Sequence, residues 1–244
     1  MPELPEVETV RLGLEKHAVG SKISEVKVLH RRATKAKSIA PLTAVTGSKI
    51  KAVNRRGKFL WFDLNSELAL VAHLGMSGQF QFKKSGSEPL SHSRVILTLG
   101  KKDLHFIDQR TFGWLSVEEK VDGIPTSASH IARDPFDPKF DIDSTIEKFL
   151  VKKTEIKRAL LDQEIMSGVG NIYADEALWA ASINPLQSCE KLSETDIKKL
   201  INSAKKIMAN SLKAGGTSFD ELYVNVNGES GYFERSLEVY GQGG

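Results

Sequence analysis

Pro2-Glu-Leu-Pro-Glu-Val-Glu-Thr-Val10 is the stretch that indicates how the chain begins to fold. Val7, Val10 and Leu14 recur at helical spacing, so residues 5–18 are predicted to form an amphipathic helix. A proline followed by acidic residues is also ordinary composition for a helix entrance, and by itself it indicates no more than that. The predicted helix would present Pro2 and Glu3 at its amino end.

This amino end carries candidate catalytic groups. Removal of Met1 would leave Pro2 with a free secondary amine, and such an amine attacks an aldehyde-like carbon to give a cationic iminium. An α-amino group titrates at about 8, well below lysine at about 10.4, so a useful fraction is nucleophilic at neutral pH. Glu3 and Glu6 add carboxylates that can transfer protons or anchor the new terminus. The opening is therefore compatible with covalent catalysis that needs no cofactor.

The composition limits the class of protein. With 244 residues the chain can form two modest domains, and 34 Lys and Arg against 31 Asp and Glu give a net charge of +3, compatible with a polyanionic partner. The single cysteine, Cys189, excludes an internal disulfide framework and a zinc site built on several cysteines. Without a signal peptide or an apolar run long enough to span a bilayer, we expect a cytoplasmic protein with no membrane partner.

The order of predicted elements divides the chain. Alternating patterns predict strands of an antiparallel β-sandwich, and helical periodicity begins only after the proline-containing stretch 132–138. The strands are expected at 22–28, 50–53, 58–64, 68–74, 94–99 and 104–107, and the helices at 144–149, 155–161, 172–181 and 194–212. We therefore predict an α+β fold with a sandwich domain at 1–132, a linker at 133–143 and a helical domain at 144–244. A strand and turn at 222–228, after Gly215, indicate either a surface connection or a loop over a site.

Basic and flexible residues gather in two turns of the predicted sandwich. Lys58 follows Arg-Arg-Gly at a strand start, where it can contact a phosphate or simply be solvated. Met76 lies in the turn His73-Leu-Gly-Met-Ser-Gly78, and it can be a wedge between bases or a filler of the core. Arg110 and Phe112 flank one position of a second turn, where they can reach and stack on bases, or where Phe112 can pack inside.

A third turn, Ser167-Gly-Val-Gly-Asn171, runs into a predicted helix. Backbone amides at such a helix start, with Asn171 beside them and Lys153 and Lys157 nearby, can hold a phosphate; a plain helical hairpin is the alternative. A nucleotide-binding fingerprint fits poorly, because no strand precedes these glycines.

Taken together, these motifs resemble the bacterial formamidopyrimidine-DNA glycosylase family over residues 2–241. The markers are the opening Pro-Glu-Leu-Pro-Glu-Val-Glu, the turn with Met76, the Arg110 and Phe112 pair and the run from Ser167, in the order and spacing of the family. The resemblance implies a β-sandwich that bears the proline helix, a helical domain with a helix-two-turn-helix motif, and DNA in the cleft between them.

The resemblance also implies roles for individual residues. Pro2 would attack C1′ of a damaged nucleotide, Glu3 would be the acid and base at the sugar, Lys58 would donate a proton and contact phosphate, and Glu6 belongs to the same catalytic set. Positions that match the family's DNA contacts are His73, His92, Arg110, Lys153, Lys157 and Asn171, and the wedge that fills the gap of the flipped base is Met76, Arg110 and Phe112. The segment 215–232 would close over the extruded base, through Gly216, Thr217, Ser218, Phe219 and Tyr223.

Two departures from the family pattern bear on activity. Family members continue into a four-cysteine zinc finger, whereas this sequence stops at Gly244 and Cys189 cannot replace four ligands, so we expect no zinc here and weakened δ-elimination and DNA binding. Thr111 stands where many relatives carry a second arginine, which bears on how the opposite base is read.

The expected function is removal of oxidised purines, 8-oxoguanine and formamidopyrimidines, from duplex DNA by a monomer. One alternative is an endonuclease VIII-type enzyme for oxidised pyrimidines, against which Leu4 and Phe112 argue, and another is a lesion-binding module without turnover.

Overall fold

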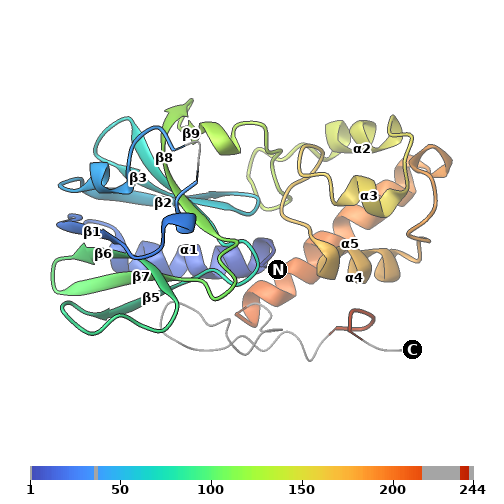
Figure 1. Ribbon diagram of the computed structural model, residues 1–244. Helices are drawn as coiled ribbons and strands as arrows, with labels where there is room; N and C mark the ends of the chain where they lie inside the picture. Colours follow the sequence, from blue (N-terminus) through green and yellow to red (C-terminus); the bar gives the residue numbers. More distant parts are fainter. Residues whose placement is uncertain (1, 36–37, 216–236, 242–244) are drawn as a thin grey trace.

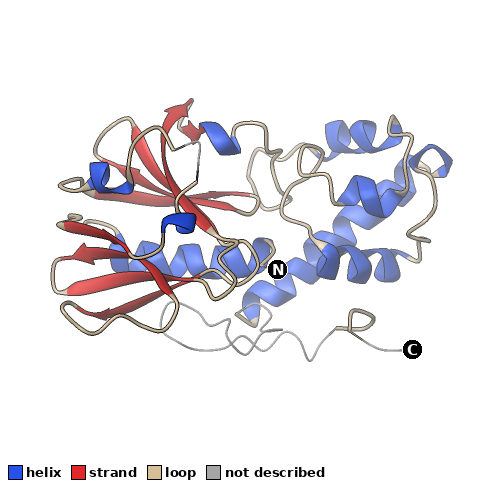
Figure 2. Ribbon diagram, in the orientation of Figure 1, coloured by secondary structure: helices blue, strands red, loops and turns tan. Residues whose placement is uncertain are grey.

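The computed structural model describes residues 2–35, 38–215 and 237–241. It has a β-sandwich followed by a group of helices. The first helix, α1, runs along the sandwich toward that group (Figure 1). Figure 2 shows that the strands lie in the first part and the longer helices, apart from α1, in the second. The predicted α+β class, with antiparallel sheets and a helical second half, is confirmed.

Two antiparallel sheets form the sandwich. One has the order β1-β6-β7-β5 and the other β2-β3-β4-β8-β9. Their bounds are β1 Glu25–Val28, β2 Ile50–Arg56, β3 Phe59–Leu64, β4 Leu68–His73, β5 Gln79–Lys84, β6 Ser93–Leu99, β7 Lys102–Ile107, β8 Trp114–Val121 and β9 Ile124–Pro125. Short 3₁₀ turns lie at η1 Arg31–Ala33, η2 Leu42–Val45 and η3 Thr126–Ala128. Residues 22–24, 58 and 74, which were predicted as strand, lie outside these strands.

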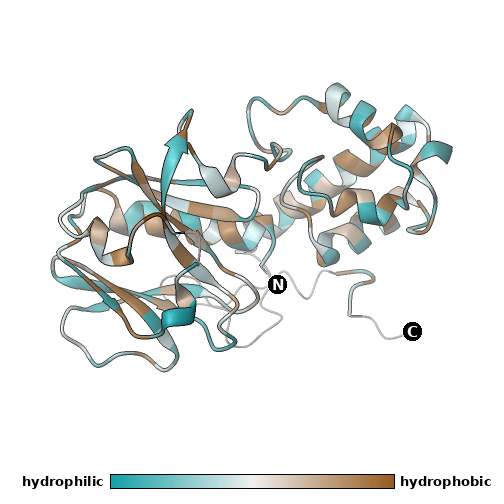
Figure 3. Ribbon diagram, turned by 45° about the horizontal axis from the view of Figure 1, so that its top comes forward, coloured by the Kyte–Doolittle hydropathy of each residue, from teal (hydrophilic) through white to brown (hydrophobic). Residues whose placement is uncertain are grey.

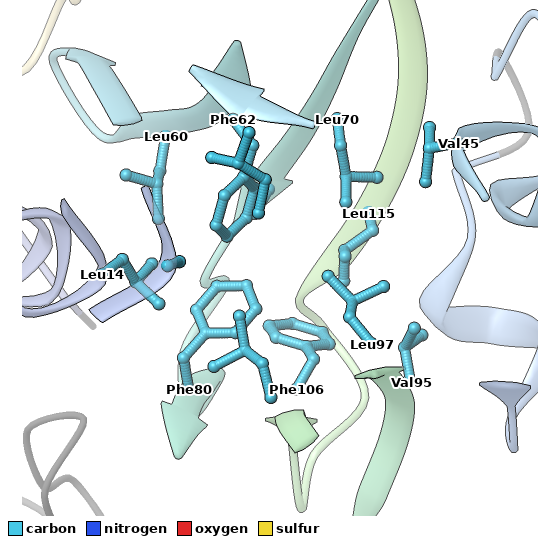
Figure 4. Close-up of a cluster of buried hydrophobic side chains, with 14 of the residues drawn as sticks. Leu14, Val45, Leu60, Phe62, Leu70, Phe80, Val95, Leu97, Phe106 and Leu115 are labelled. Atoms are coloured by element: carbon cyan, nitrogen blue, oxygen red, sulfur yellow. The ribbon is translucent and has the colours of Figure 1, made fainter. Parts of the chain in front are cut away.

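The sandwich core forms because alternate residues of both sheets point inward. Leu60, Phe62 and Leu70 of one sheet face Phe80 and Phe106 of the other (Figure 4). The ring pairs Phe62–Phe80 and Phe80–Phe106 have centroids 5.9 and 5.1 Å apart, in the edge and tilted geometries that aromatic rings prefer. In Figure 3 the hydrophobic positions likewise follow the strands and helices, whereas most connecting loops are hydrophilic.

The second half has a helical core of its own. Its elements are α2 Ile142–Leu150, α3 Ile156–Leu160, α4 Asn171–Ala181, η4 Cys189–Lys191 and α5 Glu194–Lys213. Helix α2 begins two residues before the predicted start because the Asp141 side chain accepts hydrogen bonds from the amides of Asp143 and Ser144. The predicted division at 132 lies between η3 and α2, whereas the predicted linker 133–143 overlaps the first two residues of α2; both stay predictions.

Helix α1, Leu4–Ala18, belongs to both halves. Val7, Val10 and Leu14 pack in the sandwich core, whereas Leu4 packs in the helical core. The amide of Leu4 donates to the carbonyl of Gly168, and a Cβ at Gly168 would lie 2.5 Å from a Leu4 methyl carbon, so only glycine allows this approach. The amino end of α1 therefore lies where the sandwich meets the helices (Figure 1).

Candidate active site

The amino end of α1 brings Pro2, Glu3 and Glu6 together in a buried place. Pro2 is buried, and Glu3 and Glu6 are 1% and 2% exposed. The Glu6 carboxylate accepts a hydrogen bond of 2.9 Å from the backbone amide of Glu3, which fixes the chain beside Pro2. The predicted catalytic set at the start of the helix is thus placed on a rigid element.

The Glu3 carboxylate lies at the amino end of α4. It accepts hydrogen bonds from the amides of Gly170, Ile172 (2.8 Å) and Tyr173 (3.4 Å). These amides carry the positive end of the helix dipole, which favours a negative group. The prediction that they are free to hold a phosphate is wrong, because the anion they bind is a side chain of the same protein. Asn171 itself is exposed beside them.

Burial dominates the electrostatics of Glu3. It raises the pKa of the Glu3 carboxyl from 4.5 to about 7, while the Lys58 charge and the α4 amides oppose the shift and the Glu6 charge adds to it. At neutral pH both the protonated and the ionised forms of Glu3 are therefore present. A group with this pKa can donate a proton and take one back.

Behind Glu6 lies a buried hydrogen-bond network that was not predicted from the sequence. The Tyr173 hydroxyl donates to the Glu6 carboxylate at 2.8 Å and lies 2.6 Å from the hydroxyl of Ser211 on α5. Tyr173 and Ser211 are each 0% exposed. Because a buried carboxylate is stable only when its oxygens are paired, this tyrosine fixes the position of Glu6.

Lys58 lies in the two-residue turn between β2 and β3. Gly57 has a φ of +56°, which suits the first position of a tight hairpin turn. Its carbonyl accepts a hydrogen bond of 2.9 Å from the Arg55 guanidinium. The same guanidinium binds Asp134 at 2.9 Å and Glu8 at 2.8 Å. Burial lowers the pKa of the Lys58 ammonium, and the charges of Glu3 and Glu6 oppose that shift. The charges of Lys58 and Glu3 therefore influence each other, and the catalytic role of Lys58 stays a prediction.

His73, at the end of β4, is a neutral imidazole. Burial, with the charges of Lys58 and Lys35, lowers its pKa from 6.5 to about 4. Its Nδ1 accepts a hydrogen bond of 3.1 Å from the amide of Gly75, and its ring stacks on the ring of Trp114, with the two ring centroids 5.7 Å apart. His73 can therefore offer a neutral Nε2–H as donor at neutral pH.

The predicted wedge residues lie on two turns that touch. Met76 is 42% exposed and Phe112 is 61% exposed, so neither fills the core, and Arg110 is exposed as well. A Cβ at Gly75 would lie only 2.5 Å from the amide nitrogen of Gly113, so the two turns are in backbone contact. Exposed apolar side chains on adjacent rigid turns can enter a stack of bases.

The remaining predicted contacts are dispersed. His92 is exposed with a φ of +61°, and Lys153 is exposed in the connection between α2 and α3. Lys157 forms an ion pair of 2.6 Å with Asp175, so part of its charge is compensated inside the chain. The predicted loop residues Gly216, Thr217, Ser218, Phe219 and Tyr223 lie outside the described residues.

The described residues offer no metal site. Residues 2–35, 38–215 and 237–241 contain no group of three or more His, Cys, Asp or Glu side chains arranged to hold a metal ion. Cys189, the sole cysteine of the sequence, is buried in the helical core, so these residues do not fit a four-cysteine zinc site. Within the same ranges, no helix is both long and apolar enough to cross a membrane.

Comparison with known proteins identifies the family. Residues 1–115 match the formamidopyrimidine-DNA glycosylase N-terminal domain, and residues 131–221 match the formamidopyrimidine-DNA glycosylase H2TH domain. The chain is 51% identical over 251 residues to the formamidopyrimidine-DNA glycosylase of Rhodococcus jostii, covering 99% of this chain and 86% of that protein.

Solved structures agree with this assignment. A Lactococcus lactis Fpg variant in complex with Fapy-dG-containing DNA has a TM-score of 0.87 and 32% identity, covering 100% of this chain and 89% of that one. Lactococcus lactis Fpg with abasic-site DNA also has a TM-score of 0.87 and 32% identity, covering 99% and 89%. The resemblance drawn from the sequence is confirmed: the chain belongs to the formamidopyrimidine-DNA glycosylase family of base-excision repair enzymes.

Proposed function

We propose that this chain removes oxidised purines, 8-oxoguanine and formamidopyrimidines, from duplex DNA and then cleaves the strand, with Pro2 as the nucleophile. The observation that carries the proposal is the position of Pro2 directly beside Glu3, whose pKa of about 7 lets it exchange a proton at neutral pH. The Lactococcus lactis relatives bound to Fapy-dG and abasic DNA support the class of substrate.

The first step forms a covalent bond. With Met1 removed, the lone pair of the Pro2 nitrogen attacks C1′ of the damaged nucleotide, and the glycosidic bond breaks with its electrons leaving on the base. The leaving base takes up a proton. The sugar ring opens and C1′ becomes doubly bonded to the Pro2 nitrogen as an iminium. Glu3 supplies and accepts the protons at the sugar, and its burial keeps a protonated fraction available for this role.

The second step cleaves the strand. The iminium withdraws electrons and acidifies the C2′ proton, so a base removes that proton and the 3′ phosphate leaves by β-elimination. Hydrolysis of the iminium by water then releases Pro2 and the cut DNA. Lys58, close enough to Glu3 for their charges to interact, contacts phosphate and donates a proton.

Recognition of the lesion uses the two halves. Met76, Arg110 and Phe112 fill the space that the extruded nucleotide leaves in the duplex. The DNA backbone is held by the other predicted contacts, His73, His92, Lys153, Lys157 and Asn171, with Lys157 weakest because it already pairs with Asp175. We further propose that the protein acts as a monomer on damaged DNA in the bacterial cytoplasm.

The test is chemical trapping. The 244-residue chain, with Met1 shown to be absent by mass spectrometry, is incubated with duplexes that carry 8-oxoguanine or a preformed abasic site, and borohydride is added. We expect a cross-link that maps to Pro2 on both duplexes. Trapping on the abasic duplex alone would leave a lyase without base excision, and binding without trapping would leave a lesion-binding module.

Variants separate chemistry from binding. Pro2→Gly should slow the chemistry far more than it weakens duplex binding, because a primary amine at this position is a different nucleophile on an otherwise intact surface. Pro89→Gly, in an exposed loop of the sandwich, is the control and should change neither. Equal loss of chemistry and binding in Pro2→Gly would mean that Pro2 serves structure instead.

A further inference from the structure

A single buried carboxylate joins the turns that carry the proposed wedge. Asp108 follows β7 and is 0% exposed. One of its oxygens, Oδ1, lies 2.5 Å from the Ser77 hydroxyl and 3.2 Å from the amide of Arg110. The other oxygen, Oδ2, accepts 2.6 Å from the amide of Gly113. The Met76 turn (residues 74–78) and the Phe112 turn (residues 109–112) are thus tied to the same side chain.

The backbone of Asp108 adds two hydrogen bonds to those of its side chain, and these contacts of Asp108 are here called the Asp108 node. Its amide donates to the carbonyl of His92 at 3.1 Å, and its carbonyl accepts 2.7 Å from the Arg94 guanidinium. His92, Arg110 and Met76 are exposed around this node. One residue therefore anchors three neighbouring segments that face outward with the side chains proposed to touch DNA.

The Phe112 turn is strained at the position between the two amides that Asp108 binds. Thr111 has a φ of +57°, in the left-handed region that a β-branched residue rarely adopts. Such a conformation persists only where the surroundings hold it. The hydrogen bonds to Arg110 on one side and Gly113 on the other hold this turn from both ends.

We propose that Asp108 is a positioning residue for base extrusion: it holds Met76, Arg110 and Phe112 in their inserting arrangement before DNA arrives. The inference rests on the proposed function, because it gives those three side chains the task of filling the vacated space. Because the two turns are already ordered, the entropic cost of ordering them does not add to the step in which the nucleotide leaves the stack. The effect is therefore specific to substrates in which a base pair must open.

Asparagine at this position makes a sharp test. Both carboxylate oxygens accept from backbone amides, one from Arg110 and the other from Gly113. An asparagine has one acceptor oxygen, so whichever way its amide is turned, an NH₂ group faces one of these N–H groups. Asp108→Asn keeps the volume of the side chain but weakens the hold on one end of the strained turn, either at Gly113 by removing the acceptor of its amide or at Arg110 by leaving its amide only the Ser77 hydroxyl at 3.2 Å.

The same strand provides a matched control. Asp103 on β7 is 6% exposed, and its carboxylate accepts from the Ser85 hydroxyl at 3.1 Å and from the amide of Gly86 at 3.0 Å. It therefore has the same chemistry as Asp108, but it ties a hairpin turn that carries none of the proposed wedge. Asp103→Asn should lower the thermal stability without changing either reaction below.

Two reactions are compared for each variant. The first is single-turnover excision of 8-oxoguanine from a duplex, and the second is β-elimination at an abasic site in single-stranded DNA, where no base pair has to open. We expect Asp108→Asn to slow the first reaction about tenfold or more and the second less than about twofold. The reason is that a buried amide left with a poorer partner loosens the wedge turns, which only the first reaction uses. Asp103→Asn should leave the ratio of the two rates at the wild-type value.

The outcomes distinguish this inference from the proposed function. If Asp108→Asn keeps the wild-type ratio, or slows both reactions equally, the positioning role is overturned while the wild-type activity stands. A wild-type chain that excises nothing would overturn the proposed function and this inference with it. If Asp108→Asn does not fold, Ser77→Ala, which removes one hydroxyl from the same node, decides: a lowered ratio supports the role and an unchanged ratio overturns it.

Discussion

Replacing Gly170 with alanine tests whether the amino end of α4 holds Glu3 in place for catalysis. Gly170 has a φ of −124°, so alanine brings no backbone strain. Its Cβ, however, would lie 2.4 Å from the carboxyl carbon of Glu3, where ordinary contacts begin near 3.4 Å. The Glu3 carboxylate must therefore move by about 1 Å and lose its hydrogen bonds to α4, and a displacement of that size can lower a rate about 100-fold.

The assay is single-turnover excision of 8-oxoguanine from a duplex, with borohydride trapping as a second readout. Gly170→Ala should lower the excision rate constant about 100-fold while duplex binding stays close to wild type, because no proposed DNA contact is removed. Gly20→Ala is the control. A Cβ added at Gly20 would have no neighbouring atom within 4 Å, so this change can strain the backbone, whose φ there is +86°, but cannot displace a side chain. Wild-type excision by Gly170→Ala in a folded protein would refute the reasoning that α4 positions Glu3.

Three further predictions concern stability, measured by urea unfolding. The pKa of the Glu3 carboxyl is about 7 in the folded protein and 4.5 ordinarily, so its contribution to the free energy of unfolding is present below pH 4.5 and is lost as the pH rises through 7. Glu3→Gln should remove this dependence of the unfolding free energy on pH, and an unchanged dependence would contradict the raised pKa. Tyr173→Phe removes a donor from buried Glu6 and should cost about 1–3 kcal/mol; a cost that adds fully to that of Glu6→Gln would mean that the two side chains do not interact. Arg55→Met leaves the buried Asp134 carboxylate without the Arg55 charge, although the amide of Phe136 still donates to it, and should cost about 3–5 kcal/mol; a loss below about 1 kcal/mol would mean that the ion pair contributes little.

Much of the fold could be predicted because its signals are local. Helix α1 follows from the spacing of Val7, Val10 and Leu14, and α5 from a long amphipathic pattern capped by Ser193. Strand β8 was missed, because Ser116 and Glu118 give it a polar pattern although both are buried. Their side chains bond to each other, and Glu118 also binds a backbone amide nine residues away, which a pattern of hydrophobicity does not reveal. Strand β5 was missed similarly, since its two phenylalanines alternate with glutamines before two lysines.

The candidate site divides in the same way. The proline opening, the Met76 turn and the Arg110 and Phe112 pair could be found from motifs, since each is contiguous in the sequence. The partners that fix them could not, because Tyr173 meets Glu6 across 167 positions of sequence. Capture of the Glu3 carboxylate by the amides of α4 is likewise a product of the folded arrangement. A helix start that can bind an anion does not reveal whether the anion comes from outside or from within the chain.

Helix α1, which follows Pro2, is shared between two cores, and this affects how the protein matures. Leu4 is inserted among the helices of the second half, while Val7 and Leu14 of the same helix are enclosed by the sandwich. A ribosome delivers the amine first and the helices that seat it last. The nascent sandwich thus has Glu3 without its α4 amides, and the proposed catalytic site is completed only when the second half has folded. If Pro2 acts as proposed, the chain becomes reactive toward DNA only after its second half has folded.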